Sequence, residues 1–166
     1  MRAPGSEQLS ALASVDALFE SAGVAYWLFG GWAVDFHAGS ITRPHDDVDV
    51  AVWLDDVSGI GALLEADGWR HAPEPDEDGG TGYERDGVRL ELTYLVRHAD
   101  GRVVTPLREG AAPWPLDAFS DEVLTLHGVR ARVIGLRALT RGKSSPRDEP
   151  GAAAKDRADF GALEGL

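Results

Sequence analysis

The chain of 166 residues carries 28 acidic and 16 basic side chains, a formal net charge of −12, and 43% of its residues are hydrophobic. A chain of this length can bury one core, and its negative field would repel nucleic acid and anionic membranes while attracting cationic small molecules. The absence of cysteine excludes disulfides and thiolate metal sites. Because no leader-like or membrane-spanning apolar run occurs, we expect a soluble cytoplasmic protein.

The first elements are a helix, a strand and a second helix. Apolar residues at helical spacing predict a helix over residues 6–22, with Ser6 as its N-cap and Gly23 as its stop. An aromatic and apolar run then predicts a buried strand at residues 25–29. After two glycines, residues 32–38 are predicted to form a short helix.

A further strand and helix follow. β-branched residues predict a strand at residues 48–53, because Pro44 upstream disfavours a helix there. Apolar residues on one helical face predict a helix that begins at residues 55–56 and ends before Gly68. Residues 72–82, rich in proline, glycine and acid, are predicted to be a loop.

The second half of the chain is predicted to be mostly strands. Asp86 and Gly87 favour the type I′ turn of a hairpin. The predicted elements are strands at residues 83–85, 88–96, 102–107, 123–126 and 129–134, the last two joined at His127-Gly128, then a helix at 136–142, a loop to 151 and a closing helix at 152–163. This order predicts one α+β domain, residues 1–166, with a mixed β-sheet flanked by helices and residues 135–166 as a small C-terminal helical part.

Two aspartates interrupt the apolar strand at residues 48–53. Side chains alternate along a strand, so Asp47 and Asp49 share one face, about 6.6 Å apart, while the valines between them face a core. Two carboxylates so close repel each other unless a cation compensates, and oxygen ligands suit Mg²⁺. The pattern alone is more typical of a strand end with two solvated aspartates, because short motifs often match by chance.

A glycine pair precedes these aspartates. Gly30 and Gly31 stand between a predicted strand and a predicted helix, where backbone N–H groups can approach an anion. Ordinary turns also use glycine pairs, so neither feature is specific by itself. Together they predict a phosphate cradle beside a metal-binding strand, which is what binding of a magnesium nucleotide requires.

The order of these features carries a resemblance. G-G-W-A-V-D followed by T-R-P-H-D-D-V-D-V, within residues 30–50, resembles the signature of the aminoglycoside and lincosamide nucleotidyltransferases of the DNA polymerase β-like nucleotidyltransferase superfamily. The resemblance implies the polymerase β-like nucleotidyltransferase fold. It further implies that Asp47 and Asp49 hold one or two Mg²⁺ ions and that Gly30 and Gly31 line the triphosphate of an NTP.

Three basic residues are candidates for nucleotide binding under the same resemblance. Arg43 and His45 occupy the R-x-H positions of the motif, and Lys143 follows a short predicted helix from which it could reach a phosphate. A structural interpretation of the first two stays open, in which Arg43 braces a carboxylate and His45 bonds the loop backbone. Asp35, at the W-x-x-D position, could order the glycine turn.

The superfamily also uses a third carboxylate on a neighbouring strand. In the strand at residues 88–96, Arg89, Glu91 and Thr93 share the polar face, and Glu91 is its only acid. Glu91 could act as general base for an acceptor hydroxyl, or it could complete a metal shell. The alternative is an ion pair with Arg89 on a solvated face, and Glu84 is the second candidate.

The resemblance implies a magnesium-dependent enzyme that transfers a nucleoside monophosphate, here AMP, from an NTP to a hydroxyl of an aminoglycoside- or lincosamide-like molecule. Alternatives are an antitoxin-like enzyme that nucleotidylates protein, and a non-catalytic nucleotide-binding module. Residues 74–78 are acidic and either stay solvated or gather a cationic acceptor. The expected partners are the NTP and an amine-bearing acceptor, without nucleic acid or membrane, and a homodimer would let a second subunit wall the acceptor site.

Overall fold

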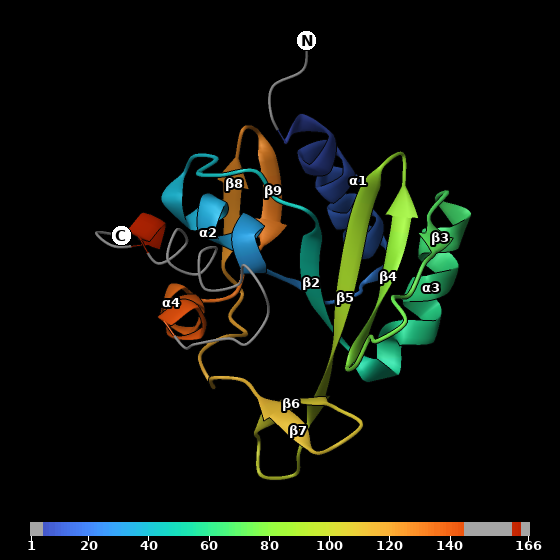
Figure 1. Cartoon of the computed structure of the whole chain (residues 1–166), viewed down its shortest axis with the longest axis vertical. Helices are drawn as coiled ribbons and strands as arrows, with labels where there is room; N and C mark the ends of the chain where they lie inside the picture. Colours follow the sequence, from blue (N-terminus) through green and yellow to red (C-terminus); the bar gives the residue numbers. More distant parts are fainter. Residues whose placement is uncertain (1–4, 145–160, 164–166) are drawn as a thin grey trace.

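The computed structural model describes residues 5–144 and 161–163, with helices packed around a twisted sheet (Figure 1). Its elements are α1 (Ser6–Ala22), β1 (Trp27–Phe29), α2 (Gly30–Ala38), β2 (Val48–Trp53), the 3₁₀-helix η1 (Leu54–Asp56), α3 (Val57–Ala66), β3 (Arg70–His71), β4 (Gly80–Arg85), β5 (Val88–Arg97), β6 (Val103–Pro106), β7 (Ala111–Pro113), β8 (Val123–Leu126), β9 (Val129–Arg132) and α4 (Leu136–Ser144).

The main sheet is mixed, as the sequence predicts. Its strands follow the order β1-β2-β5-β4-β3, with β6 paired to β5 and β7 paired to β6. β2 and β5 run parallel, whereas the other pairs of this sheet run antiparallel. A tight turn cannot join parallel neighbours. The chain therefore reaches β5 from β2 through α3, β3 and β4, while β8 and β9 form a separate hairpin.

The valines and leucines at the centre of the sheet pack on one of its faces. Val50 and Val52 of β2 are fully buried, and Leu90 and Leu92 of β5 are 1% exposed. α1 and α3 cover this face (Figure 1), and their apolar side chains belong to the same cluster of buried residues. The alternation of the strands therefore directs Asp49 and Glu91 to the opposite face, which positions the candidate site.

Several predicted elements are confirmed with little change. β2 has the predicted bounds, and α1 ends before Gly23, whose backbone is left-handed at φ 69°. The hairpin turns also form as expected, because Asp86 and Gly87 have φ values of 50° and 81°. His127 and its following glycine adopt the same type of turn, with φ 48° and 80°.

Other details are wrong. Ser6 is the first residue of α1 rather than its N-cap, since Gly5 precedes the helix and no side chain caps it. α2 begins at Gly30, two residues early, because positive φ at this glycine turns the strand directly into the helix. The short strands β3 and β7 were not predicted, and α4 continues to Ser144 where a loop was expected.

The C-terminal predictions are tested only in part. Residues 161–163 are helical, as predicted for the end of the closing helix, while residues 152–160 lie outside the described residues. The assignment of residues 135–166 to a separate helical part stays a prediction. Among residues 5–144 and 161–163, no helix combines the length and apolar character that crossing a membrane requires.

Candidate active site

The central carboxylates are brought together by the parallel pairing of β2 and β5. Asp49 is the register partner of Glu91 on one side and of Phe29 in β1 on the other. Neighbouring strands lie about 4.8 Å apart, and paired residues point to the same face. Two candidate residues far apart in the sequence thus stand side by side on the face opposite the core.

Asp47 is the third candidate carboxylate. It directly precedes β2 and is partly exposed. Within residues 5–144 and 161–163, no group of three or more His, Asp or Glu side chains converges closely enough to enclose a metal ion. The structure therefore places Asp49 with Glu91 but does not assemble all three carboxylates into a closed cage.

The glycine pair packs directly against the carboxylate strand. A Cβ atom at Gly30 would lie 2.6 Å from Oδ2 of Asp49, so only a glycine leaves room for this carboxylate. A Cβ atom at Gly31 would collide with Nδ1 of His45 and would lie 2.8 Å from Nη2 of Arg43. The start of α2, where backbone N–H groups lack helical partners, therefore faces the motif residues that follow it.

His45 is held by a buried aspartate. Its Nε2 lies 2.5 Å from Oδ2 of Asp35, and the two side chains are 3% and 0% exposed. Oδ1 of Asp35 accepts hydrogen bonds from the backbone N–H of Thr42, at 3.1 Å, and from its hydroxyl, at 2.6 Å. Asp35 thereby fixes both the imidazole and the loop before β2, which sequence reasoning noted only as a possibility for the W-x-x-D position.

The remaining nitrogen of His45 has a different environment. Nδ1 is buried and makes no hydrogen bond within the described structure. The indole of Trp32, itself 1% exposed, packs on the imidazole with ring centroids 4.7 Å apart. Nδ1 is thus a polar atom without a protein partner, directed at Gly31, the second glycine of the candidate phosphate cradle.

The other basic candidates are Arg43 and Lys143. Nη1 of Arg43 donates to the backbone oxygen of Pro44 at 3.1 Å, while its Nη2 approaches Gly31. Lys143 lies in α4, but its side chain is outside the described part of the structure. Its role in phosphate binding therefore stays a prediction.

Glu91 combines an ion pair with a raised proton affinity. Nε of Arg89 donates to its Oε1 at 2.5 Å, so the pairing considered as an alternative does form. Burial is the largest influence on Glu91, and together with the hydrogen bond that protonated Glu91 donates to the Glu77 carboxylate it outweighs Arg89 and raises the pKa of Glu91 to about 7. A carboxylate with a pKa near neutrality suits proton abstraction at physiological pH.

Glu84, the second candidate, occupies a different environment. Its Oε2 accepts a hydrogen bond from Nη2 of Arg70 at 2.6 Å, and its side chain is 41% exposed. It pairs in register with Arg89 rather than with Glu91. The geometry therefore favours Glu91 as the strand carboxylate.

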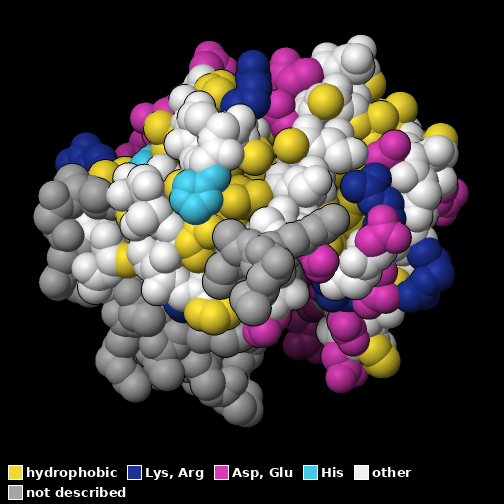
Figure 2. Space-filling view, turned by 90° about the horizontal axis from the view of Figure 1, so that it is seen from above, with side chains coloured by type: hydrophobic (Ala, Val, Ile, Leu, Met, Phe, Trp, Pro, Cys, Tyr) yellow, Lys and Arg dark blue, Asp and Glu magenta, His cyan; other side chains and the backbone are white. Residues whose placement is uncertain are grey.

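The acidic loop, residues 74–78, folds against the site instead of remaining fully solvated. The Glu77 side chain is 15% exposed and lies near Arg89, and the backbone oxygen of Glu77 accepts a hydrogen bond from Arg108 at 2.7 Å. The backbone N–H of Arg108 donates to Asp78 at 2.9 Å. Elsewhere on the surface, acidic and basic side chains intermingle, as on the right side of Figure 2.

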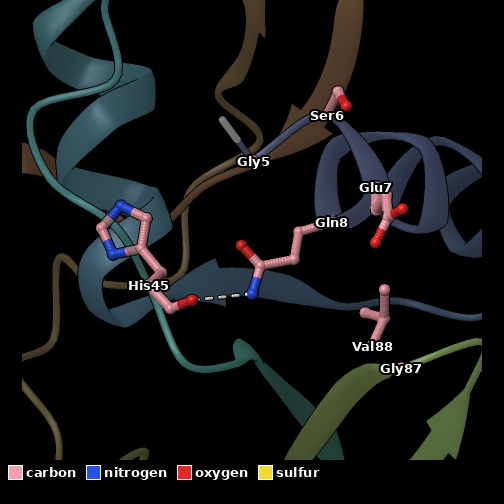
Figure 3. A pocket seen from close by; sticks show the side chains of 7 residues that line it. All are labelled: Gly5, Ser6, Glu7, Gln8, His45, Gly87 and Val88. Carbon is pink, nitrogen blue, oxygen red and sulfur yellow. Dashed lines mark hydrogen bonds between the residues drawn. The ribbon is translucent and has the colours of Figure 1, made fainter. Parts of the chain in front are cut away.

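A cavity of about 360 Å³ lies beside His45. It is lined by Gly5, Ser6, Glu7, Gln8, His45, Gly87 and Val88 (Figure 3). Nε2 of Gln8 donates to the backbone oxygen of His45 at 2.8 Å across its edge. Neither Asp49 nor Glu91 lines this cavity, so it neighbours the candidate site without containing the carboxylates.

Comparison with known proteins agrees with this geometry. The model of the aminoglycoside-2''-adenylyltransferase family matches residues 11–163. The chain belongs to this family. Its resemblance to aminoglycoside and lincosamide nucleotidyltransferases is thereby confirmed.

Individual relatives are more distant. A 2''-aminoglycoside nucleotidyltransferase of Klebsiella pneumoniae is 30% identical over 69 residues, which are 42% of this chain and 39% of the relative. One of Escherichia coli matches to the same extent. The matched sequence thus spans well under half of these curated relatives.

Solved structures extend the likeness to the whole fold. Lincosamide antibiotic adenylyltransferase LnuA, solved with lincomycin bound, covers 93% of this chain and 94% of its own, with a TM-score of 0.73 and 22% identity. ANT(2")-Ia, in complex with adenylyl-2"-tobramycin, covers 95% and 90%, with a TM-score of 0.70 and 21% identity. These likenesses confirm the predicted nucleotidyltransferase fold.

Proposed function

We propose that the protein is a nucleotidyltransferase that moves a nucleoside monophosphate, AMP by its family, from an NTP to a hydroxyl of an amine-bearing antibiotic, with release of pyrophosphate. The observation that carries the proposal is the contact of Asp49 with Gly30 at the start of α2, combined with its register to Glu91. An anion-binding helix start and two carboxylates thereby meet at one point.

The donor set at this point fits magnesium. Asp47 and Asp49 supply carboxylate oxygens, which Mg²⁺ prefers, and the space left by Gly30 allows a phosphate to approach both the backbone and Asp49. Asp47 and Asp49 would hold one or two ions. The metal would supply stabilisation of the negative charge on the attacking and leaving oxygens.

The surrounding residues have separate roles. Glu91 accepts the proton of the acceptor hydroxyl, for which its raised pKa is suited. The N–H groups of Gly30 and Gly31 bind phosphate, and Arg43 and Lys143 add positive charge. Nδ1 of His45, without a protein partner, would face the same phosphates.

The class of acceptor is inferred from the family and from charge. Solved relatives hold lincomycin or an adenylylated tobramycin. The net charge of −12 of this chain would favour the approach of a similar amine-bearing molecule.

The test is an assay of product mass with Mg²⁺, each NTP and a panel of aminoglycosides and lincosamides. We expect one acceptor to gain a nucleoside monophosphate, and Asp49→Asn to lower the rate at least about 100-fold, since metal stabilisation of charge is worth several kcal/mol. Asp55→Asn, an exposed aspartate just past the other end of β2, is the matched control and should retain the activity. Absence of any adduct together with absence of NTP binding would refute the proposal.

A further inference from the structure

Arg89 lies at the centre of a cluster of acidic side chains beside the candidate site. Its guanidinium is 16% exposed and contacts groups from β4, β5 and the acidic loop. From the sequence, Arg89 is expected only as an ion-pair partner for Glu91. Its contacts indicate a larger role, because this one side chain connects Glu91 to the acidic loop, whose position the sequence does not predict.

The position of Arg89 depends on a glycine. Gly82 of β4 is the register partner of Glu91, and a Cβ atom there would collide with Nη2 of Arg89 and lie 2.7 Å from its Cζ. The guanidinium therefore lies against Gly82 of β4, in space that a Cβ atom would occupy. This placement brings its Nε to Oε1 of Glu91 at 2.5 Å.

The same guanidinium also holds the acidic loop. Nη1 donates to the backbone oxygen of Ala72 at 2.9 Å, just before the loop. Nη2 lies 3.4 Å from Oε1 of Glu74 and 3.5 Å from Oε1 of Glu77. Both loop carboxylates therefore lie within ion-pair distance of Arg89 and share its single positive charge with Glu84 and Glu91, so neither is an isolated charge.

A glutamate at this position needs such a restraint more than an aspartate would. Glu91 carries an additional rotatable bond, and freezing a glutamate costs up to about 2 kcal/mol of rotamer entropy. Arg89 holds one of its oxygens and, through the loop, the neighbouring Glu77. We propose that Arg89 is a positioning residue that keeps the Glu91 carboxylate beside Asp49 and docks the acidic loop over the same strand.

This inference rests on the proposed function, so its test has a kinetic arm and an arm independent of activity. In the kinetic arm, Arg89→Met should lower kcat about 10- to 100-fold while leaving the KM for NTP unchanged, because misplacing a reacting group by about 1 Å has an effect of that order. Arg89→Lys should restore part of kcat. Arg70→Met removes an exposed arginine that shares the partner Glu84, and should behave as wild type.

A double-mutant cycle tests whether Arg89 acts through Glu91. In a Glu91→Gln background, Arg89→Met should have little further effect, because the group that it positions has already been lost. If the effects of Arg89→Met and Glu91→Gln on kcat multiplied fully, or if Arg89→Met kept the wild-type kcat, the inference would be overturned even in an active enzyme.

The second arm measures amide hydrogen exchange of residues 72–79. We expect Arg89→Met to accelerate exchange at Ala72 and Glu74 by at least about tenfold, since these amides bond to Gly82 and to the Glu77 side chain in the docked loop. Arg70→Met should leave them unchanged. A wild-type protein that transfers no nucleotide would refute the proposed function alone, whereas unchanged exchange in Arg89→Met would overturn the docking role of Arg89.

Discussion

At the scale of single residues, the proton affinity of Glu91 results from opposing neighbours. Burial and the nearby Glu77 carboxyl group raise its pKa, and the Arg89 guanidinium lowers it by a smaller amount. A folded-state pKa above the ordinary carboxyl value means that the folded protein binds this proton more tightly than the unfolded chain. Ionisation of Glu91 therefore lowers the free energy of unfolding, a cost that fits a carboxylate whose charge is used in catalysis.

We expect this cost to appear in the pH dependence of unfolding. Between the ordinary pKa of 4.5 and the raised value of about 7, the unfolded chain releases the proton and the folded protein retains it, so the free energy of unfolding falls with rising pH. Glu91→Gln lacks this contribution. Urea unfolding with EDTA across about pH 4 to 8 should therefore show the mutant gaining stability relative to wild type as pH rises. A difference independent of pH would contradict the raised pKa.

At the scale of elements, the start of α2 is the proposed phosphate-binding point and packs against the carboxylate strand. Gly30 has φ 71° and packs against the Asp49 carboxylate, so the turn from β1 into the helix directly adjoins the metal-binding candidate. The sequence predicted the glycine pair as a break between strand and helix. The helix starts two residues earlier than predicted, because Gly30 with its left-handed backbone connects β1 directly to α2.

Gly30→Ala should separate this effect from ordinary helix propensity. Left-handed backbone costs a residue with a Cβ atom about 1–2 kcal/mol, and the new methyl group would displace Asp49, so we expect lower stability and NTP affinity reduced at least about tenfold. Gly59→Ala in α3 is the control, because nothing lies within 4 Å of its Cβ position. This control should be neutral or stabilising in urea unfolding and should bind NTP as wild type does by calorimetry.

Sequence patterns predicted which side chains share a face of a strand better than they predicted which strands lie side by side. The alternation in β2 placed Asp49 opposite the valine core, and Asp-Gly placed the turn before β5, because both are local effects. The parallel register that sets Asp49 beside Glu91 depends on which strands pair, and alternation carries no information about that. The docking of Glu77 on Arg89 was also missed, since it requires the space above Gly82.

At the scale of the whole molecule, charge should influence the encounter with an acceptor. The net charge of −12 produces an attractive field for polyamines. Screening shortens this field, with a Debye length of about 10 Å at 0.1 M salt. The described acidic loop is tied to Arg89 and Arg108, so we attribute attraction to the overall charge rather than to this loop.

Ionic strength tests this attribution. For a polycationic aminoglycoside acceptor, kcat/KM should fall several-fold between about 0.05 M and 0.3 M NaCl, because screening weakens long-range attraction. Saturating kcat should change little. Replacing Glu74 by Gln should leave the salt dependence as in wild type, and a loss of the dependence in this variant would assign the attraction to the loop instead.

The parallel pairing of β2 with β5 has a consequence for recognising such proteins. The glycine pair, Asp47 and Asp49 all precede α3 in the sequence, whereas Glu91 in β5 follows α3, β3 and β4. A fragment that ends at β2 would therefore carry the recognisable signature without the strand that completes the chemistry. In this chain the motif and the proposed general base are therefore separate in sequence, and the pairing of β5 with β2 brings them together.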